Sequence, residues 1–119
     1  MTASVLAAPS FAGLTLDRPR LMAVINATPD SFSDGGEAFA VDDAVRRGRA
    51  FLAEGADILD IGGESTRPGA EPVPEAEEIR RVVPVIETLA TEGALISIDS
   101  RRAEVMRAAV NAGARIIND

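Results

Sequence analysis

The chain contains no histidine, cysteine, lysine, tryptophan or tyrosine. Without cysteine, disulfides and thiolate chemistry are excluded. Without histidine the commonest general base and transition-metal ligand are missing, and without lysine there is no Schiff-base chemistry. Catalysis by this chain would therefore have to use carboxylates, amides, hydroxyls, arginine and backbone dipoles, together with a hard cation if it uses a metal.

Positive charge is also scarce, and all of it is arginine. There are 12 basic and 19 acidic residues, giving a net charge of −7. This excludes a general nucleic-acid surface, which needs a basic face, but a local arginine, a metal or a helix N-terminus can still hold a small anion. Apolar runs fall short of the about 20 residues of a membrane span, and residues 1–10 lack the basic segment of a signal peptide. We predict a cytoplasmic protein with a flexible leader over residues 1–10.

Short apolar runs alternate with amphipathic segments along the rest of the chain. The apolar runs predict strands at 11–16, 21–26, 57–61, 94–99 and 114–118. The helical periodicity predicts three helices: from Asp42 or Asp43 to about Glu54, from Pro74 to Gly93 with a kink or restart at Pro84, and over 102–112.

A Gly-Ala-x-Ile repeat punctuates this pattern at residues 55–58, 93–96 and 113–116. Each copy is interpreted as a helix stop that leads into a strand. The order βαβαβαβ predicts an α/β fold with parallel strands and right-handed crossovers. A complete (β/α)₈ barrel has about 250 residues, so either a small open sheet or the N-terminal half of a TIM barrel fits this length. The polar loops favour a half-barrel over residues 11–119, truncated after its fourth strand.

Polar residues stand where the predicted strands end, at Asn26, Asp60, Asp99 and Asn118. The C-terminal ends of parallel strands lie on one side of the sheet, so these groups should converge. Amides and carboxylates suit a heterocycle with N–H and C=O edges, although caps for loop N–H groups would need the same residue types. The Asn26 oxygen suits Mg²⁺ held mainly by substrate phosphates, but an isolated asparagine is also a common turn former.

Two polar loops follow the first two main strands. The first reads N-A-T-P-D-S-F-S-D-G-G at 26–36, and the second G-G-E-S-T-R-P-G at 62–69. Phe32 would contact a ligand or act as a lid, and Asp34 would stabilise a developing cation unless it only forms a turn. Arg67 would stack on a flat ring or pair with a carboxylate, unless it is a solvated loop residue. The arginine pairs at 46–47 and 80–81 are interpreted as solvated helix faces.

These loops resemble the two signature loops of the dihydropteroate synthase family. The segments I-S-I-D-S at 96–100 and I-I-N-D at 116–119 resemble the ends of its third and fourth strands, so the similarity runs from about Leu21 to Asp119 with order and spacing intact. The resemblance implies a TIM barrel and the joining of 6-hydroxymethyl-7,8-dihydropterin diphosphate to 4-aminobenzoate. The products are dihydropteroate and pyrophosphate, in folate biosynthesis, by an enzyme class that sulfonamides inhibit.

The resemblance also implies roles for individual residues. Asn26 would bind Mg²⁺ and the diphosphate. Asp34 and Arg67 would be catalytic. The remaining implied contacts are Thr66, Asp99 and Asn118 with the pterin diphosphate, and Phe32, Thr66, Arg67 and Pro68 with 4-aminobenzoate. The family takes a further Asp, Lys, Arg and His from the second half of the barrel, and the full-length form would be a homodimer.

Two other interpretations stay open on the sequence alone. A pterin-binding methyltransferase domain that uses methyltetrahydrofolate would share the barrel and parts of the pattern. A non-catalytic half-barrel would pair with a partner chain to cover its open sheet, because an exposed sheet edge and an uncovered apolar face favour association. Under all three interpretations we expect little or no turnover from the isolated 119-residue chain.

Overall fold

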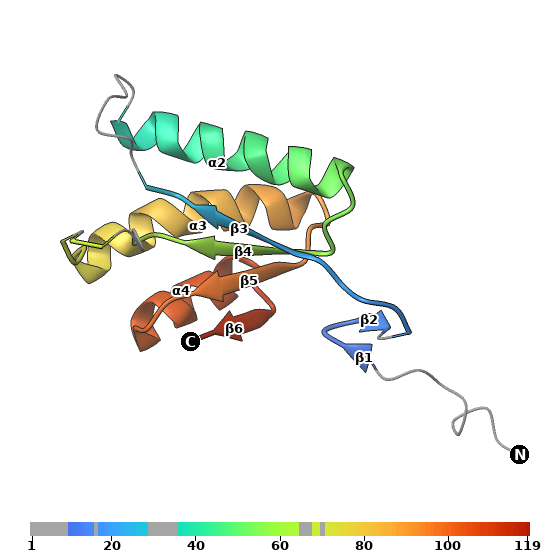
Figure 1. The fold of residues 1–119 in the computed structure, drawn as a ribbon. Helices are drawn as coiled ribbons and strands as arrows, with labels where there is room; N and C mark the ends of the chain where they lie inside the picture. The colour runs from blue at the N-terminus through green and yellow to red at the C-terminus, as the bar shows by residue number, and fades with distance from the viewer. Residues whose placement is uncertain (1–9, 16, 29–35, 65–67, 70) are drawn as a thin grey trace, which may run out of the picture.

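The computed structural model describes residues 10–15, 17–28, 36–64, 68–69 and 71–119. Within them a small hairpin precedes a regular alternation of strands and helices (Figure 1). The elements are β1 (Ser10–Phe11), β2 (Leu14–Thr15), β3 (Met22–Asn26), α2 (Gly36–Ala53), β4 (Ile58–Gly62), α3 (Glu75–Thr91), β5 (Ile96–Asp99), α4 (Ala103–Ala112) and β6 (Ile116–Asn118).

The main sheet has four strands in the order β3-β4-β5-β6, and every neighbouring pair is parallel. All four arrows point the same way in Figure 1. When strands that follow one another in the sequence are also neighbours in the sheet, right-handed crossovers place all the connecting helices on one face of the sheet. Accordingly, α2 packs on α3 and α3 packs on α4. A doubly wound sheet would reverse its strand order and carry helices on both faces. The predicted first half of a TIM barrel is therefore confirmed.

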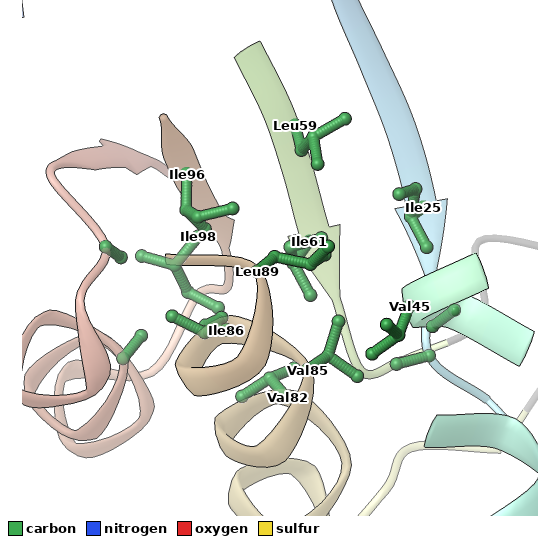
Figure 2. Packing of buried hydrophobic residues seen from close by; sticks show 14 of the residues in the cluster. Ile25, Val45, Leu59, Ile61, Val82, Val85, Ile86, Leu89, Ile96 and Ile98 are labelled. Atoms are coloured by element: carbon green, nitrogen blue, oxygen red, sulfur yellow. The ribbon is translucent and has the colours of Figure 1, made fainter. Parts of the chain in front are cut away.

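The core lies between the sheet and this helix layer. Ile25, Ile61 and Ile98 pair in register across β3, β4 and β5, and all three are fully buried. Figure 2 shows these strand residues opposite the buried side chains of α3, which are Val82, Val85, Ile86 and Leu89. The opposite face of the sheet is different in character: Met22 and Val24 of β3 are about half exposed there, at 45% and 57%.

The Gly-Ala-x-Ile repeat is confirmed as a helix stop. Gly55, Gly93 and Gly113 all have positive φ, which places them in a conformation that favours glycine after a helix. In each copy the next alanine donates its N–H to the carbonyl five residues back, as in Ala94 N to Leu89 O at 3.0 Å. Because these alanines cap the helices, β5 and β6 begin two residues later than predicted.

Helix α2 corrects the sequence prediction, because it begins at Gly36 and not at Asp42 or Asp43. Ala40 is buried and lies one turn before the buried Ala44, so the apolar stripe extends toward the N-terminus. Asp43 is an internal helix residue that accepts hydrogen bonds from Arg46 and, at 2.9 Å, from Arg47.

Helix α3 runs through Pro84 as one element, so of the two expected outcomes, a kink or a restart, the restart does not occur. Val82, Val85 and Ile86 are fully buried around the proline, and this tertiary packing holds both parts of the helix in place.

The predicted edge strand at 11–16 is instead the β1–β2 hairpin, whose turn residues Ala12 and Gly13 have φ of 50° and 86°. Positive φ at both turn positions suits a two-residue hairpin.

Candidate functional site

The ends of the four parallel strands form one row across the sheet. Asn26 pairs with Gly62, Gly62 with Asp99, and Asp99 with Asn118. Side chains in one row of a sheet point to the same face, and here it is the face away from the helices because Ile25, Ile61 and Ile98 occupy the other. The structure therefore brings together three of the predicted site residues, Asn26, Asp99 and Asn118.

Gly62 leaves a gap in the middle of this row. A Cβ at Gly62 would lie 3.4 Å from Asn26 Oδ1 and 3.6 Å from Asp99 Oδ2. The amide oxygen of Asn26 and a carboxylate oxygen of Asp99 thus flank the glycine on either side. Any side chain at this position would occupy the space between them, and glycine keeps that space open to a ligand.

Asp60 lies one row deeper on the same face and is 2% exposed. Its Oδ2 accepts a hydrogen bond of 3.1 Å from Asn118 Nδ2. Its Oδ1 is buried without a hydrogen-bond partner among the described residues, and so is the hydroxyl of Ser97, which pairs with Asp60 in register. Buried polar atoms are nearly always satisfied, so these two groups are free to take a hydrogen bond from a ligand or a water.

Burial is the main reason that the pKa of Asp99 is raised, and the neighbouring carboxylates of Asp60 and Glu78 raise it further. Both effects disfavour the charged form of the carboxyl group. A ligand that presents N–H donors to Asp99 would relieve this cost.

The oxygen atoms in the row also suit a hard cation. Among the described residues no group of three or more acidic or histidine side chains could hold a metal ion by itself. Asn26 Oδ1 and Asp99 Oδ2 are nevertheless both oxygen donors beside the open position at Gly62. Mg²⁺ takes few protein ligands and completes its shell with phosphate oxygens and water, so this donor set fits a magnesium ion that arrives with a phosphorylated substrate.

Two arginines that the sequence analysis assigned to solvated helix faces instead hold the ends of strands. Arg47 Nη2 donates to the carbonyl of Asn26, and Arg81 Nη1 donates to the carbonyl of Gly63, both at 3.0 Å. Each arginine also binds the acid four residues before it, Asp43 or Glu77. The repeated pattern acid-x-x-Arg-Arg at 43–47 and 77–81 was the sequence signal that could have revealed this role.

Hydrogen bonds and ion pairs join the beginning and the end of the segment between β4 and α3. Glu64 Oε2 accepts the Val73 N–H at 3.0 Å, which is the main reason that the pKa of Glu64 is lowered, with Arg101 adding to it. Arg102 donates to the Val73 carbonyl and, at 2.9 Å, to Glu78, whose side chain is 1% exposed. The base of the second signature loop is therefore fixed.

Several predicted site residues lie outside the described residues, namely Phe32, Asp34, Thr66 and Arg67. Pro68 is described and is exposed to solvent.

A hollow of about 170 Å³ lies at the opposite end of the sheet, between β3 and α2, where Leu21, Met22 and Phe51 line it. Its described lining is apolar apart from Glu54, in contrast to the several polar groups of the row at the strand ends.

No helix in the described part of the chain has the length and apolarity that crossing a bilayer requires. Curated relatives are about half identical to the chain over the residues that align with it. A dihydropteroate synthase of Mycobacterium leprae is 51% identical over 106 residues, covering 89% of the chain and 37% of that protein. A probable bifunctional folylpolyglutamate synthase/dihydropteroate synthase of Haloferax volcanii is 55% identical over 103 residues, covering 87% of the chain and 12% of that protein.

Solved structures give the same result. A Xanthomonas albilineans dihydropteroate synthase with 4-aminobenzoic acid superimposes with a TM-score of 0.82 at 61% identity, covering 89% of the chain and 40% of that protein. A second structure from Xanthomonas albilineans, in complex with 7,8-dihydropteroate, has a TM-score of 0.76 at 55% identity and covers 89% of the chain and 38% of that protein. The chain thus spans less than half the length of these relatives. Residues 22–119 match the family described as pterin binding enzyme, and the chain belongs to that family.

Proposed function

We propose that the chain forms the N-terminal half of the active site of a dihydropteroate synthase. The observation that carries this proposal is the row of Asn26, Gly62, Asp99 and Asn118 on the uncovered face of the sheet. Its amide and carboxylate groups complement a flat heterocycle with donor and acceptor edges, and relatives at similar identity bind 4-aminobenzoic acid or 7,8-dihydropteroate.

In this proposal the two sides of the site have different tasks. Asp99, Asn118 and Thr66 bind the pterin diphosphate, and Asp99 and Asn118 bond to the pterin edge. Phe32, Thr66, Arg67 and Pro68 form the 4-aminobenzoate pocket, where the Arg67 guanidinium suits the carboxylate or the flat face of the ring. The network of Arg102 and Glu64 supports this half of the site by fixing the base of the second loop.

The chemistry is displacement at the methylene carbon of the pterin diphosphate. The bond from that carbon to the diphosphate oxygen breaks, and pyrophosphate leaves with the electron pair. The neutral aromatic amine then forms the C–N bond and gives up one proton. Loss of the leaving group makes the ring electron-poor, and the carboxylate of Asp34 would stabilise that developing positive charge. The amine is already unprotonated at pH 7, so no histidine or lysine base is needed from this half.

Mg²⁺ is the implied cofactor, and Asn26 would hold it with the diphosphate oxygens. When bound, the ion neutralises charge on the leaving pyrophosphate. The Arg47 hydrogen bond to the Asn26 carbonyl keeps the backbone of this residue in place.

The test is turnover of the pterin diphosphate and 4-aminobenzoate by a chain extended through the four further βα units of its relatives, beside the 119-residue chain. We expect the extended protein to form dihydropteroate and to be inhibited by a sulfonamide, and the shorter chain to show little or no turnover. An Arg67→Ala variant of the extended protein should lose activity, and unchanged kinetics would remove Arg67 from the mechanism. Binding of methyltetrahydrofolate without binding of the pterin diphosphate would instead support a methyltransferase.

The wider assignment follows from the family and from composition. We propose that the full-length protein is a cytoplasmic homodimer with no nucleic-acid or membrane partner. The leader expected over residues 1–10 lies outside the described residues, except for Ser10, which belongs to β1. Size-exclusion chromatography with light scattering measures the oligomeric state directly. For the 119-residue chain, a stable compact monomer would argue against obligate pairing of the half-barrel with a partner.

A further inference from the structure

We propose that Asp60 is a positioning residue that sets which way round the Asn118 amide faces, and so makes the site select an aminopyrimidine edge. This inference rests on the proposed function, because it names how that site distinguishes its heterocycle. It begins from the hydrogen bond of 3.1 Å between Asn118 Nδ2 and Asp60 Oδ2.

The chemistry of the two groups fixes the direction of this bond. An ionised carboxylate can only accept, whereas the two ends of a primary amide differ: the oxygen accepts and the nitrogen donates. The nitrogen of Asn118 must therefore face Asp60, and its oxygen must face away. Without Asp60 the exposed amide of Asn118 could turn over and present either end.

Asp60 itself is held firmly enough to impose this orientation. Asp60 is 2% exposed. On β4 it lies between Val24 of β3 and Ser97 of β5, which pair with it in register. A buried side chain on a central strand has little rotational freedom compared with Asn118, which lies exposed at the edge strand β6. The orientation is thus set by the buried partner and passed to the exposed one.

The groups that Asn118 then presents form a defined pattern. One N–H is used by Asp60, and within the described part of the chain the second N–H and Oδ1 take no other hydrogen bond. An acceptor beside a donor complements the amidine edge of an aminopyrimidine, which has an amino donor beside a ring-nitrogen acceptor. The same pattern does not complement an edge with a ring N–H beside a carbonyl, because the donor and the acceptor of that edge have exchanged places.

Two unpartnered atoms nearby leave hydrogen-bonding capacity for a further polar group. Asp60 Oδ1 and Ser97 Oγ are buried and lack a partner among the described residues. Water or a ligand N–H that reached them would satisfy Asp60 fully and leave its bond to Asn118 intact. A polar site of this kind discriminates strongly, because a mismatched ligand leaves buried groups unpaired.

The experiment compares two ligands that differ only at this edge, 6-hydroxymethylpterin and 6-hydroxymethyllumazine, in which a ring N–H and a carbonyl replace the amidine. Their dissociation constants are measured by calorimetry with the 119-residue chain and its variants. We expect the wild-type chain to prefer the pterin, and Asp60→Asn to reduce that preference by at least about fivefold, since an amide at position 60 can pair with either end of Asn118. Asp57→Asn is the matched control, because it makes the same change just before the same strand and away from the row.

A double-mutant cycle separates positioning from a structural role. Asn118→Ala, at an exposed position, should abolish the preference, and adding Asp60→Asn to it should change nothing further. If Asp60→Asn weakened both ligands equally, if it still changed the ratio in the Asn118→Ala background, or if the wild type bound both ligands equally, the inference would be overturned.

Failure of the proposed function has a different signature. If the wild type bound neither pteridine, the pterin assignment would fall, and the side-chain amide signals of Asn118 in a ¹⁵N-labelled sample would decide the inference. Asp60→Asn should then move these signals and Asp57→Asn should not. Unmoved signals in Asp60→Asn would refute the positioning role, and circular dichroism of each variant verifies that it is folded.

Discussion

Arg47 on α2 donates a hydrogen bond of 3.0 Å to the backbone carbonyl of Asn26 at the end of β3. The helix that follows the first signature loop therefore holds the residue at which that loop begins. Arg81 does the same on α3 for Gly63, so two successive βα units are closed in the same way. These two hydrogen bonds hold the backbone on which the row of site residues stands.

Replacing Arg47 with methionine should weaken ligand binding more than it weakens the fold. The Asn26 carbonyl would lose a charged donor, at a cost of about 1–2 kcal/mol in the free energy of unfolding, and Asn26 would lose its fixed backbone. Urea denaturation and pterin titration measure the two effects. Arg46→Met is the control, because Arg46 bonds to Asp43 alone among the described side chains and is largely exposed. An equal effect of both variants on pterin affinity would contradict the anchoring role.

The neighbouring glycines Gly62 and Gly63 should respond differently to alanine. At Gly63 a Cβ would lie 3.0 Å from Val82 and 3.1 Å from the Glu78 carbonyl, so Gly63→Ala should destabilise the fold by about 1–3 kcal/mol. At Gly62 the nearest atoms are at ordinary contact distance, so Gly62→Ala should fold normally but fill the gap between Asn26 and Asp99. Denaturation and binding measured on both variants test this, and a Gly62→Ala chain with undiminished affinity would show that the gap is not used.

Asp99→Asn should stabilise the chain at neutral pH while weakening pterin binding. Because the pKa of Asp99 is raised in the folded state, the folded chain holds this proton more tightly than the unfolded chain does. The contribution of Asp99 to the free energy of unfolding therefore falls as pH rises from 3.8, the usual pKa of an aspartate, through the raised pKa. Above the raised pKa this contribution stays unfavourable. The difference in unfolding free energy between Asp99→Asn and wild type should grow over this interval and then level off. A difference that is independent of pH would contradict the raised pKa.

The buried pair of Arg102 and Glu78 should matter far more for stability than exposed pairs do. Arg102→Met leaves the carboxylate of Glu78, 1% exposed, without its partner, which should cost about 3 kcal/mol or more. Arg107→Met breaks a pair in which both side chains are more than half exposed, and should cost less than about 1 kcal/mol. Chemical denaturation of the two variants gives both numbers, and similar losses would show that the Arg102 network does not fix the loop base.

Local signals in the sequence predicted most of the fold. The apolar runs predicted four parallel strands, and the Gly-Ala-x-Ile repeat predicted the helix stops because both depend on residues close together in the chain. The start of α2 was mispredicted, and the restart that was one of two expectations at Pro84 does not occur. Packing of Ala40 and of the residues around Pro84 against the sheet outweighs local preference.

The sequence allowed the main site residues to be grouped, but it did not reveal the residues that hold them in place. Asn26, Asp99 and Asn118 could be grouped because parallel strands end on one side of a sheet. The bond between Asn118 and Asp60, 58 positions apart, and the reach of Arg47 and Arg81 to backbone carbonyls depend on register and on helix rotation, which no local pattern specifies. Nothing in the structure tests the roles given to Phe32, Asp34, Thr66 and Arg67, which stay predictions.

The most direct test of the account is a titration of the ¹⁵N-labelled 119-residue chain with 6-hydroxymethylpterin, followed by amide chemical shifts. If the strand ends form the pterin site, the amides of Asn26, Gly62, Asp99 and Asn118 should shift together and saturate with one dissociation constant, while Leu21 and Ala56 at the opposite end of the sheet stay unchanged. Saturable shifts confined to that opposite end, or no shifts in the row at saturating ligand, would contradict it.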